Sequence, residues 1–154
     1  MVSSIRFWLK AFGIIDLETE KTTEIGNFLF DDHIGRDKYL EDETSLWLLH
    51  YLLIITDYSS IYSIIFNEFR KLRPEFDKTN FANYIEELDS TINQNTLSKD
   101  FSVFLRTYHS KNSKNKEDSF SGILSDLELI YEIKKKDETS KFSISNSKAH
   151  NFRE

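Results

Sequence analysis

The chain has no cysteine, a single proline and four glycines in 154 residues. Without cysteine it cannot form a disulfide, use a thiolate nucleophile or hold zinc through sulfur. The scarcity of proline and glycine argues against a sandwich of short strands and favours a helix-rich chain. Thirteen Phe and seven Tyr supply volume for a packed core. We therefore expect a mainly α-helical protein in a reducing compartment, the cytoplasm.

Long hydrophobic runs are also scarce. The most apolar segment, "LWLLHYLLII" at residues 46–55, is too short to cross a bilayer and is followed by the polar "TDYSS". Residues 1–10 lack the basic start and apolar core of a secretory leader. We expect a soluble protein without membrane contact. The formal net charge of −6 also excludes a uniformly basic nucleic-acid binder, so such binding would need a local basic face.

Helical periodicity in the middle of the chain predicts a central antiparallel helix pair. The two helices cover about residues 42–55 and 59–72, are joined by the polar "DYSS", and stop before Pro74. Two further helices are expected to begin at Asp77 and Thr96, whose side chains can cap them. The stretch "LIYEIKKKDETSKFSIS" alternates, which predicts a small C-terminal β-hairpin that turns near residues 137–138.

The opening segment "SIRFWLKAFGII" predicts a helix with two faces. Its apolar face is spaced to pack inward and its polar face carries a hydroxyl and two cations; the two sets are Ile5, Leu9 and Phe12, and Ser3, Arg6 and Lys10. Gly13 can end this helix, "II" can start a strand, and Lys21-Thr22 can return after the polar tip "DLETEK". A short helix capped by Thr23 should follow.

The order of helix, glycine, strand, tip and return strand is that of the second half of a winged helix, whose recognition helix enters the major groove of DNA. We expect Ser3, Arg6 and Lys10 to contact duplex DNA, with Lys21 on the wing. The plainer interpretation is an amphipathic helix whose cations only solvate its outer face. The chain then divides into a winged-helix remnant, a helical core, a flexible polar loop, and a short helix with a hairpin and frayed tail, at residues 1–37, 38–109, 110–119 and 120–154.

A weaker pattern lies near the C-terminus. Glu132-Ile133-Lys134, with Asp118 or Asp126 upstream, has the acid…acid-x-lysine order of metal-dependent nucleases, but such triplets are common in a chain this charged. His33 lies among three aspartates, which is typical of a polar surface loop, and no Gly-rich phosphate loop or His-Glu-x-x-His motif occurs. We assign no catalytic residue, no metal site and no cofactor.

Four stretches, followed by "EDSFSGILSDLELI", resemble a bacterial family catalogued as domain of unknown function 4007; they are "MVSSIRFWLKAFGII", "YLEDETSLWLLHYLL", "IIFNEFR" and "LSKDFSVFLRTY". The resemblance runs to about residue 130, and the region after Ile133 looks unlike the family. Members are longer at both ends, with a leading segment that would supply the first helices of a winged-helix unit, so the chain looks truncated. They tend to be encoded beside sulfotransfer-type and DNA phosphorothioation defence genes.

The resemblance implies a non-enzymatic, DNA-associated accessory protein of a bacterial DNA-modification defence system, with duplex DNA and other proteins of that system as partners. Two other classes stay open on the residues alone. A helical protein-interaction module would dock its apolar faces on a partner without binding DNA. A metal-dependent nuclease would depend on Glu132.

Overall fold

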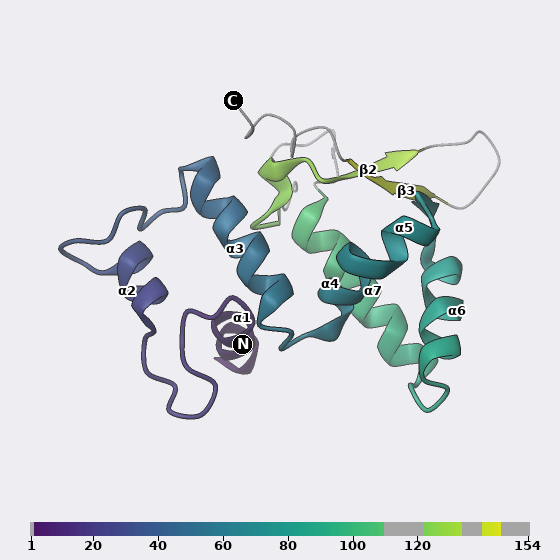
Figure 1. Ribbon diagram of the computed structural model, residues 1–154, viewed down its shortest axis with the longest axis horizontal. Helices are drawn as coiled ribbons and strands as arrows, with labels where there is room; N and C mark the ends of the chain where they lie inside the picture. The colour runs from purple at the N-terminus through teal and green to yellow at the C-terminus, as the bar shows by residue number, and fades with distance from the viewer. Residues whose placement is uncertain (1, 110–121, 134–139, 146–154) are drawn as a thin grey trace. The chain divides into compact units, whose positions relative to one another are not determined.

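The computed structural model describes residues 2–109, 122–133 and 140–145 (Figure 1). The protein is mainly helical with one small antiparallel sheet, as its periodicity predicts. It divides into two compact units, unit 1 (Met1–Ser63) and unit 2 (Ile64–Glu154). The division falls inside the segment 38–109 that we expected to form one helical core, and the expected loop at 110–119 lies outside the described residues.

Unit 1 begins with α1 (Val2–Ala11) and a tight hairpin over residues 14–23. Gly13 ends the helical segment with φ +65°, a left-handed conformation in which glycine carries no Cβ penalty. One antiparallel bridge joins Ile15 to Thr22, and the N–H of Asp16 donates to the carbonyl of Lys21 at 2.8 Å. The predicted return of the chain therefore forms, but a single bridge does not establish a winged helix.

Two capped helices complete unit 1. Thr23 caps α2 (Glu24–Phe30) as predicted, and Asp42 caps α3 (Glu43–Ile55) by accepting from the N–H of Thr44 at 2.8 Å. The Thr56 hydroxyl donates to the carbonyl of Ala11 at 2.7 Å, which joins the end of α3 to the end of α1. The buried side chains of these elements form the core of unit 1: Ala11, Phe12, Ile14, Leu29, Leu46, Leu49, Leu52 and Leu53.

The second helix of the predicted central pair forms over residues 60–72, but it is not a regular α-helix throughout. It begins as α4 (Ser60–Ile64), continues through a π-helical turn, η1 (Ile65–Phe69), and ends as α5 (Arg70–Leu72). The Phe66 ring lies 5.1 Å from that of Tyr108, and the Phe69 ring lies 5.3 Å from that of Phe76. Because these aromatic side chains are buried against later segments, η1 supplies part of the core of unit 2.

In unit 2, α6 (Lys78–Leu88) and α7 (Gln94–Tyr108) pack side by side (Figure 1). Asp77 caps α6 as predicted, through a capping box with Asn80. The cap of α7 is Asn93 rather than Thr96, so this helix begins earlier than expected. A 3₁₀ turn, η2 (Ser125–Leu127), follows α7 within the described ranges.

The sheet of unit 2 has the order β1-β3-β2 and consists of β1 (Glu75–Phe76), β2 (Ile130–Ile133) and β3 (Lys141–Ile144). β2 and β3 are antiparallel, with Ile130 opposite Ile144 and Ile133 opposite Lys141. This pairing confirms the two antiparallel strands of the predicted hairpin, while the turn expected near residues 137–138 lies outside the described residues. β1 pairs with β3 as a third strand that the sequence did not predict.

Across the described ranges, no single helix has the length and apolar composition needed to cross a membrane. Only α3 taken together with the helix over residues 60–72, as a bent pair, meets that test.

Candidate functional site

The two cations of α1 lie against the hairpin. Lys10 Nζ lies 2.8 Å from Glu20 Oε1, and Arg6 Nε lies 3.5 Å from Glu20 Oε2. The Lys10 side chain is 15% exposed, whereas that of Arg6 is 58% exposed. The hydrogen bond from Lys10, with a smaller contribution from the Arg6 charge, holds the pKa of Glu20 below its usual value. Two of the residues expected to contact DNA are thus already matched by a carboxylate.

The other two residues expected to contact DNA, Ser3 and Lys21, are exposed. Ser3 lies near the start of α1, and Lys21 follows Glu20 on the hairpin, without an ion pair to any described residue. Ile5 was expected to pack inward, and that expectation is wrong, because its side chain is 56% exposed. The inward packing of α1 comes from residues further along, where the Trp8 ring stacks on that of Phe12 at 5.5 Å.

The surroundings of α1 are acidic. The hairpin tip carries Asp16, Glu18 and Glu20, and Asp16 accepts from the N–H of Thr19 at 2.8 Å, which lowers the pKa of Asp16. Residues 1–63 contain five Lys and Arg against eleven Asp and Glu, whereas residues 64–154 contain fifteen of each. The whole formal net charge of −6 therefore belongs to unit 1, and such a charge repels a phosphate backbone.

A second feature of unit 1 is the acidic loop, residues 31–42, between α2 and α3. The Asp31 carboxylate accepts from the N–H groups of His33 and Ile34 at 2.8 and 3.0 Å. The chain then folds back, since the N–H of Arg36 donates to the carbonyl of Phe28 at 2.9 Å. These bonds belong to a turn with a fixed course. Asp31, one of the three aspartates around His33, therefore binds the backbone of its own loop, as expected for a polar surface loop.

The second half of the acidic loop is held by Asp37. Its carboxylate accepts from the N–H groups of Glu41 and Asp42 at 2.8 and 3.0 Å. Burial alone would raise the pKa of Asp37, but hydrogen bonds from the Ser45 hydroxyl and from these amides outweigh it, so the pKa is lowered. Asp31 also has a lowered pKa, caused by the N–H groups of His33 and Ile34. Both carboxylates therefore carry a negative charge at neutral pH.

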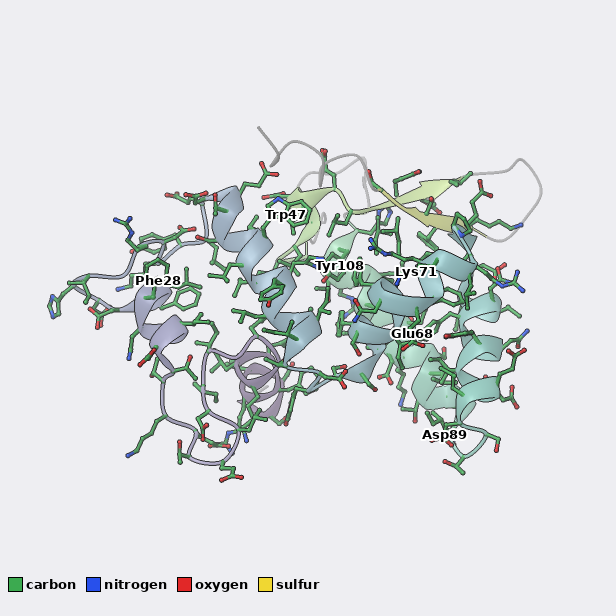
Figure 2. All side chains as sticks on the ribbon, in the orientation of Figure 1. Phe28, Trp47, Glu68, Lys71, Asp89 and Tyr108 are labelled. Carbon is green, nitrogen blue, oxygen red and sulfur yellow. The ribbon has the colours of Figure 1, made fainter. Side chains whose placement is uncertain are left out.

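This ordered loop presents apolar side chains to solvent. Ile34 is 79% exposed and Tyr39 is 78% exposed, the highest values for large apolar residues in the part of the chain that the structure describes. Figure 1 shows the chain after α2 swinging out beyond that helix before it returns to α3. Phe28, labelled on α2 in Figure 2, is 54% exposed. Scattered apolar residues are ordinary on a surface, but two of them on a loop fixed by its own hydrogen bonds suggest an interaction site.

Unit 2 has a basic cluster, Arg70, Lys71 and Arg73, that was not predicted from the sequence. All three residues are exposed, and none forms an ion pair with a described residue. Figure 2 labels Lys71 on the same helix as Glu68, which accepts from the Tyr84 hydroxyl at 3.1 Å. Burial, together with this hydrogen bond, raises the pKa of Tyr84. The signal available in the sequence was three cations within four residues, directly before the only proline.

The residues of the nuclease pattern are only partly described. Glu132 lies on β2 and Asp126 lies in η2, while Asp118 and Lys134 fall outside the described ranges. Among the residues that the structure places, no group of three or more His, Asp or Glu side chains could hold a metal ion. The nuclease hypothesis gains no support from the described residues.

Comparison with known proteins gives one match. The family model described as "Protein of unknown function (DUF4007)" matches residues 1–154. The match extends past Ile133, so the expectation that the chain departs from the family there is wrong. No curated protein and no solved structure matches the chain.

Proposed function

The chain belongs to the DUF4007 family of proteins of unknown function, and we propose that unit 1 acts as a protein-interaction module whose binding element is the acidic loop. The observation that carries this proposal is the exposure of Ile34 and Tyr39, about four fifths each, on a loop whose backbone is fixed by Asp31 and Asp37.

An ordered loop with apolar tips is suited to binding a protein. Ordering a flexible segment on binding costs free energy, and this cost is smaller for a loop that its own hydrogen bonds already hold. Tyrosine is common among the residues that dominate interface energetics, because it buries a large ring and offers a hydroxyl at its edge. The loop's formal charge of −3 would favour a partner surface with a basic rim. The partners implied by the family resemblance are other proteins of a DNA-modification defence system.

Duplex DNA remains the second candidate, through α1 and the hairpin. The observation that favours it is that the helix, Gly13 and the hairpin form in the expected order, with Ser3, Arg6 and Lys21 exposed. It ranks second because Glu20 engages Arg6 and Lys10, and because unit 1 is strongly acidic. Phosphate binding would have to compete with that carboxylate.

A quantitative co-purification tests the first candidate. The tagged full chain is isolated from cells that carry the gene, and the bound proteins are compared with those on Ile34→Ser/Tyr39→Ser. The control is Leu88→Ser/Ile92→Ser, which removes two exposed apolar side chains from unit 2. We expect one or more proteins to be depleted about tenfold by the loop variant alone, since loss of a buried anchor costs on the order of 1–2 kcal/mol. Equal recovery on both variants would refute the proposal.

A duplex titration tests the second candidate. Fluorescence anisotropy of a labelled duplex is followed at low and physiological salt for the full chain and for Arg6→Ala/Lys21→Ala. If protein binding is the function, the wild type and the variant bind equally weakly. Salt-sensitive binding that the variant loses would instead assign DNA contact to α1 and the hairpin.

A further inference from the structure

The acidic loop and the basic cluster are complementary in both charge and apolar content. Residues 31–42 contain five Asp and Glu against two Lys and Arg, and they present Ile34 and Tyr39. Residues 70–73 contain three cations and no acid, and they present Leu72, which is 66% exposed. Each surface has an apolar centre, and the charges around the two centres are opposite in sign.

The basic cluster forms no ion pair with the acids near it along the chain, Glu68, Glu75 and Asp77. Glu68, one turn before it, accepts from the Tyr84 hydroxyl at 3.1 Å. Asp77, after Pro74, accepts from the N–H of Asn80 at 2.8 Å and so belongs to the cap of α6. Cations at the end of a helix are favoured by its dipole, but three within four residues repel one another unless an anion lies close.

Asp31 of the acidic loop keeps lone pairs free for such cations, whereas Asp32 already pairs with Lys38. An ionised carboxylate has about four acceptor sites; Asp31 uses two on backbone amides that orient the group, whereas Asp37 accepts from the Ser45 hydroxyl as well as from its amides and has less capacity left. A guanidinium binds a carboxylate of fixed orientation through two parallel hydrogen bonds, which makes Arg70 and Arg73 suitable partners. The backbone bonds thus hold the loop in shape and leave its charge available.

We propose that the chain associates with a second copy of itself, the acidic loop of one copy docking on the basic cluster of the other, with Ile34 and Tyr39 against Leu72. This inference rests on the proposed protein-binding role of the loop and names its partner. A contact of one loop and one helix end is small beside a standard interface, so we expect a dissociation constant of about 10–100 µM and a strong dependence on salt.

Sedimentation velocity over a wide range of protein concentrations tests the proposal. The full chain is compared with a cluster variant, Arg70→Glu/Arg73→Glu, and with a loop variant, Asp32→Arg/Glu41→Arg. We expect the wild type to show a concentration-dependent rise in mass that high salt suppresses. Each variant alone should stay monomeric, because like charges then face each other. An equal mixture of the two should associate again, since each reversed surface meets a complementary one.

A matched control separates this specific pairing from the effect of net charge. Lys99→Glu/Arg106→Glu changes the net charge as much as the cluster variant but alters exposed cations on α7, so it should associate like the wild type. A wild-type chain that is monomeric throughout, or a mixture that fails to associate, overturns the inference. If the chain is monomeric while Ile34→Ser/Tyr39→Ser still loses a co-purified protein, self-association is wrong and the proposed protein-binding function stands.

Discussion

Thr23 joins three segments of unit 1, and its replacement by valine tests how that joint is held. Its Oγ1 donates to the carbonyl of Gly13 at 2.7 Å and accepts from the N–H of Gly26 at 3.1 Å. Thr23→Val keeps the branched shape and removes both bonds, while Thr23→Ser keeps both bonds and removes one methyl group. The pair therefore separates hydrogen bonding from packing.

The expected loss for Thr23→Val is about 2 kcal/mol. An N-cap hydroxyl contributes about 1 kcal/mol, and a half-buried carbonyl that loses its donor adds a similar amount. In thermal unfolding followed by circular dichroism, this corresponds to a fall in Tm of about 5–15 °C. The amide of Gly26 should also exchange faster with deuterium. Thr23→Ser should lose no more than about 1 kcal/mol. A Thr23→Val protein as stable as the wild type, or a Thr23→Ser protein as unstable as Thr23→Val, would refute the reasoning.

Three further substitutions test the packing and the charges. Gly26→Ala should destabilise unit 1 by about 2 kcal/mol or more in urea unfolding, because the added Cβ would lie 2.4 Å from the carbonyl oxygen of Ile14; full stability would show that this contact yields freely. Phe69→Ala should cost about 3–5 kcal/mol, since this side chain is fully buried; a loss below about 1 kcal/mol would contradict its place in the core. Because the pKa of Asp37 is lowered in the folded state, its ionised carboxylate stabilises the fold above the unfolded pKa of about 3.9, and this stabilisation is lost as pH falls through the folded pKa. The urea midpoint of Asp37→Asn should therefore fall less steeply than that of the wild type below about pH 4. Parallel pH profiles of the two proteins would contradict this.

Helix starts were predictable because their signals are local. Thr23, Asp42 and Asp77 each precede an apolar stretch and accept from a backbone amide two or three residues later, within reach of sequence reasoning. The start of α7 was missed because Asn93 and Thr96 both suit a cap, and only the packing of the helix selects between them. The antiparallel pairing of β2 with β3 was predicted from the alternation of apolar and polar residues in the two strands.

Features that depend on distant partners were beyond sequence reasoning. β1 is two residues long and exists because it pairs with β3, more than sixty residues later. The π turn of η1 leaves no mark in the hydrophobic spacing, since Phe66 and Phe69 are buried by contacts with α6, α7 and β1.

In the candidate site, some residues were placed correctly from the sequence, whereas the contacts between them were missed. Periodicity correctly placed Ser3, Arg6 and Lys10 on one helix, but it could not show that Glu20 meets two of them. That meeting requires the hairpin to turn with Glu20 at φ +57°, a left-handed conformation that composition does not indicate. In the acidic loop, the aspartates suggested a solvated turn, whereas the exposure of Ile34 became visible only with the backbone bonds that hold it.

Site-specific photocrosslinking tests most directly whether the acidic loop is a protein-binding element. A photoreactive amino acid is placed at position 34 in the full chain, and at position 5 as a control, because Ile5 is also an exposed apolar residue of unit 1. After irradiation in cells, we predict protein adducts from position 34 and none from position 5. Nucleic-acid adducts from position 5, with no protein adduct from position 34, would contradict the account.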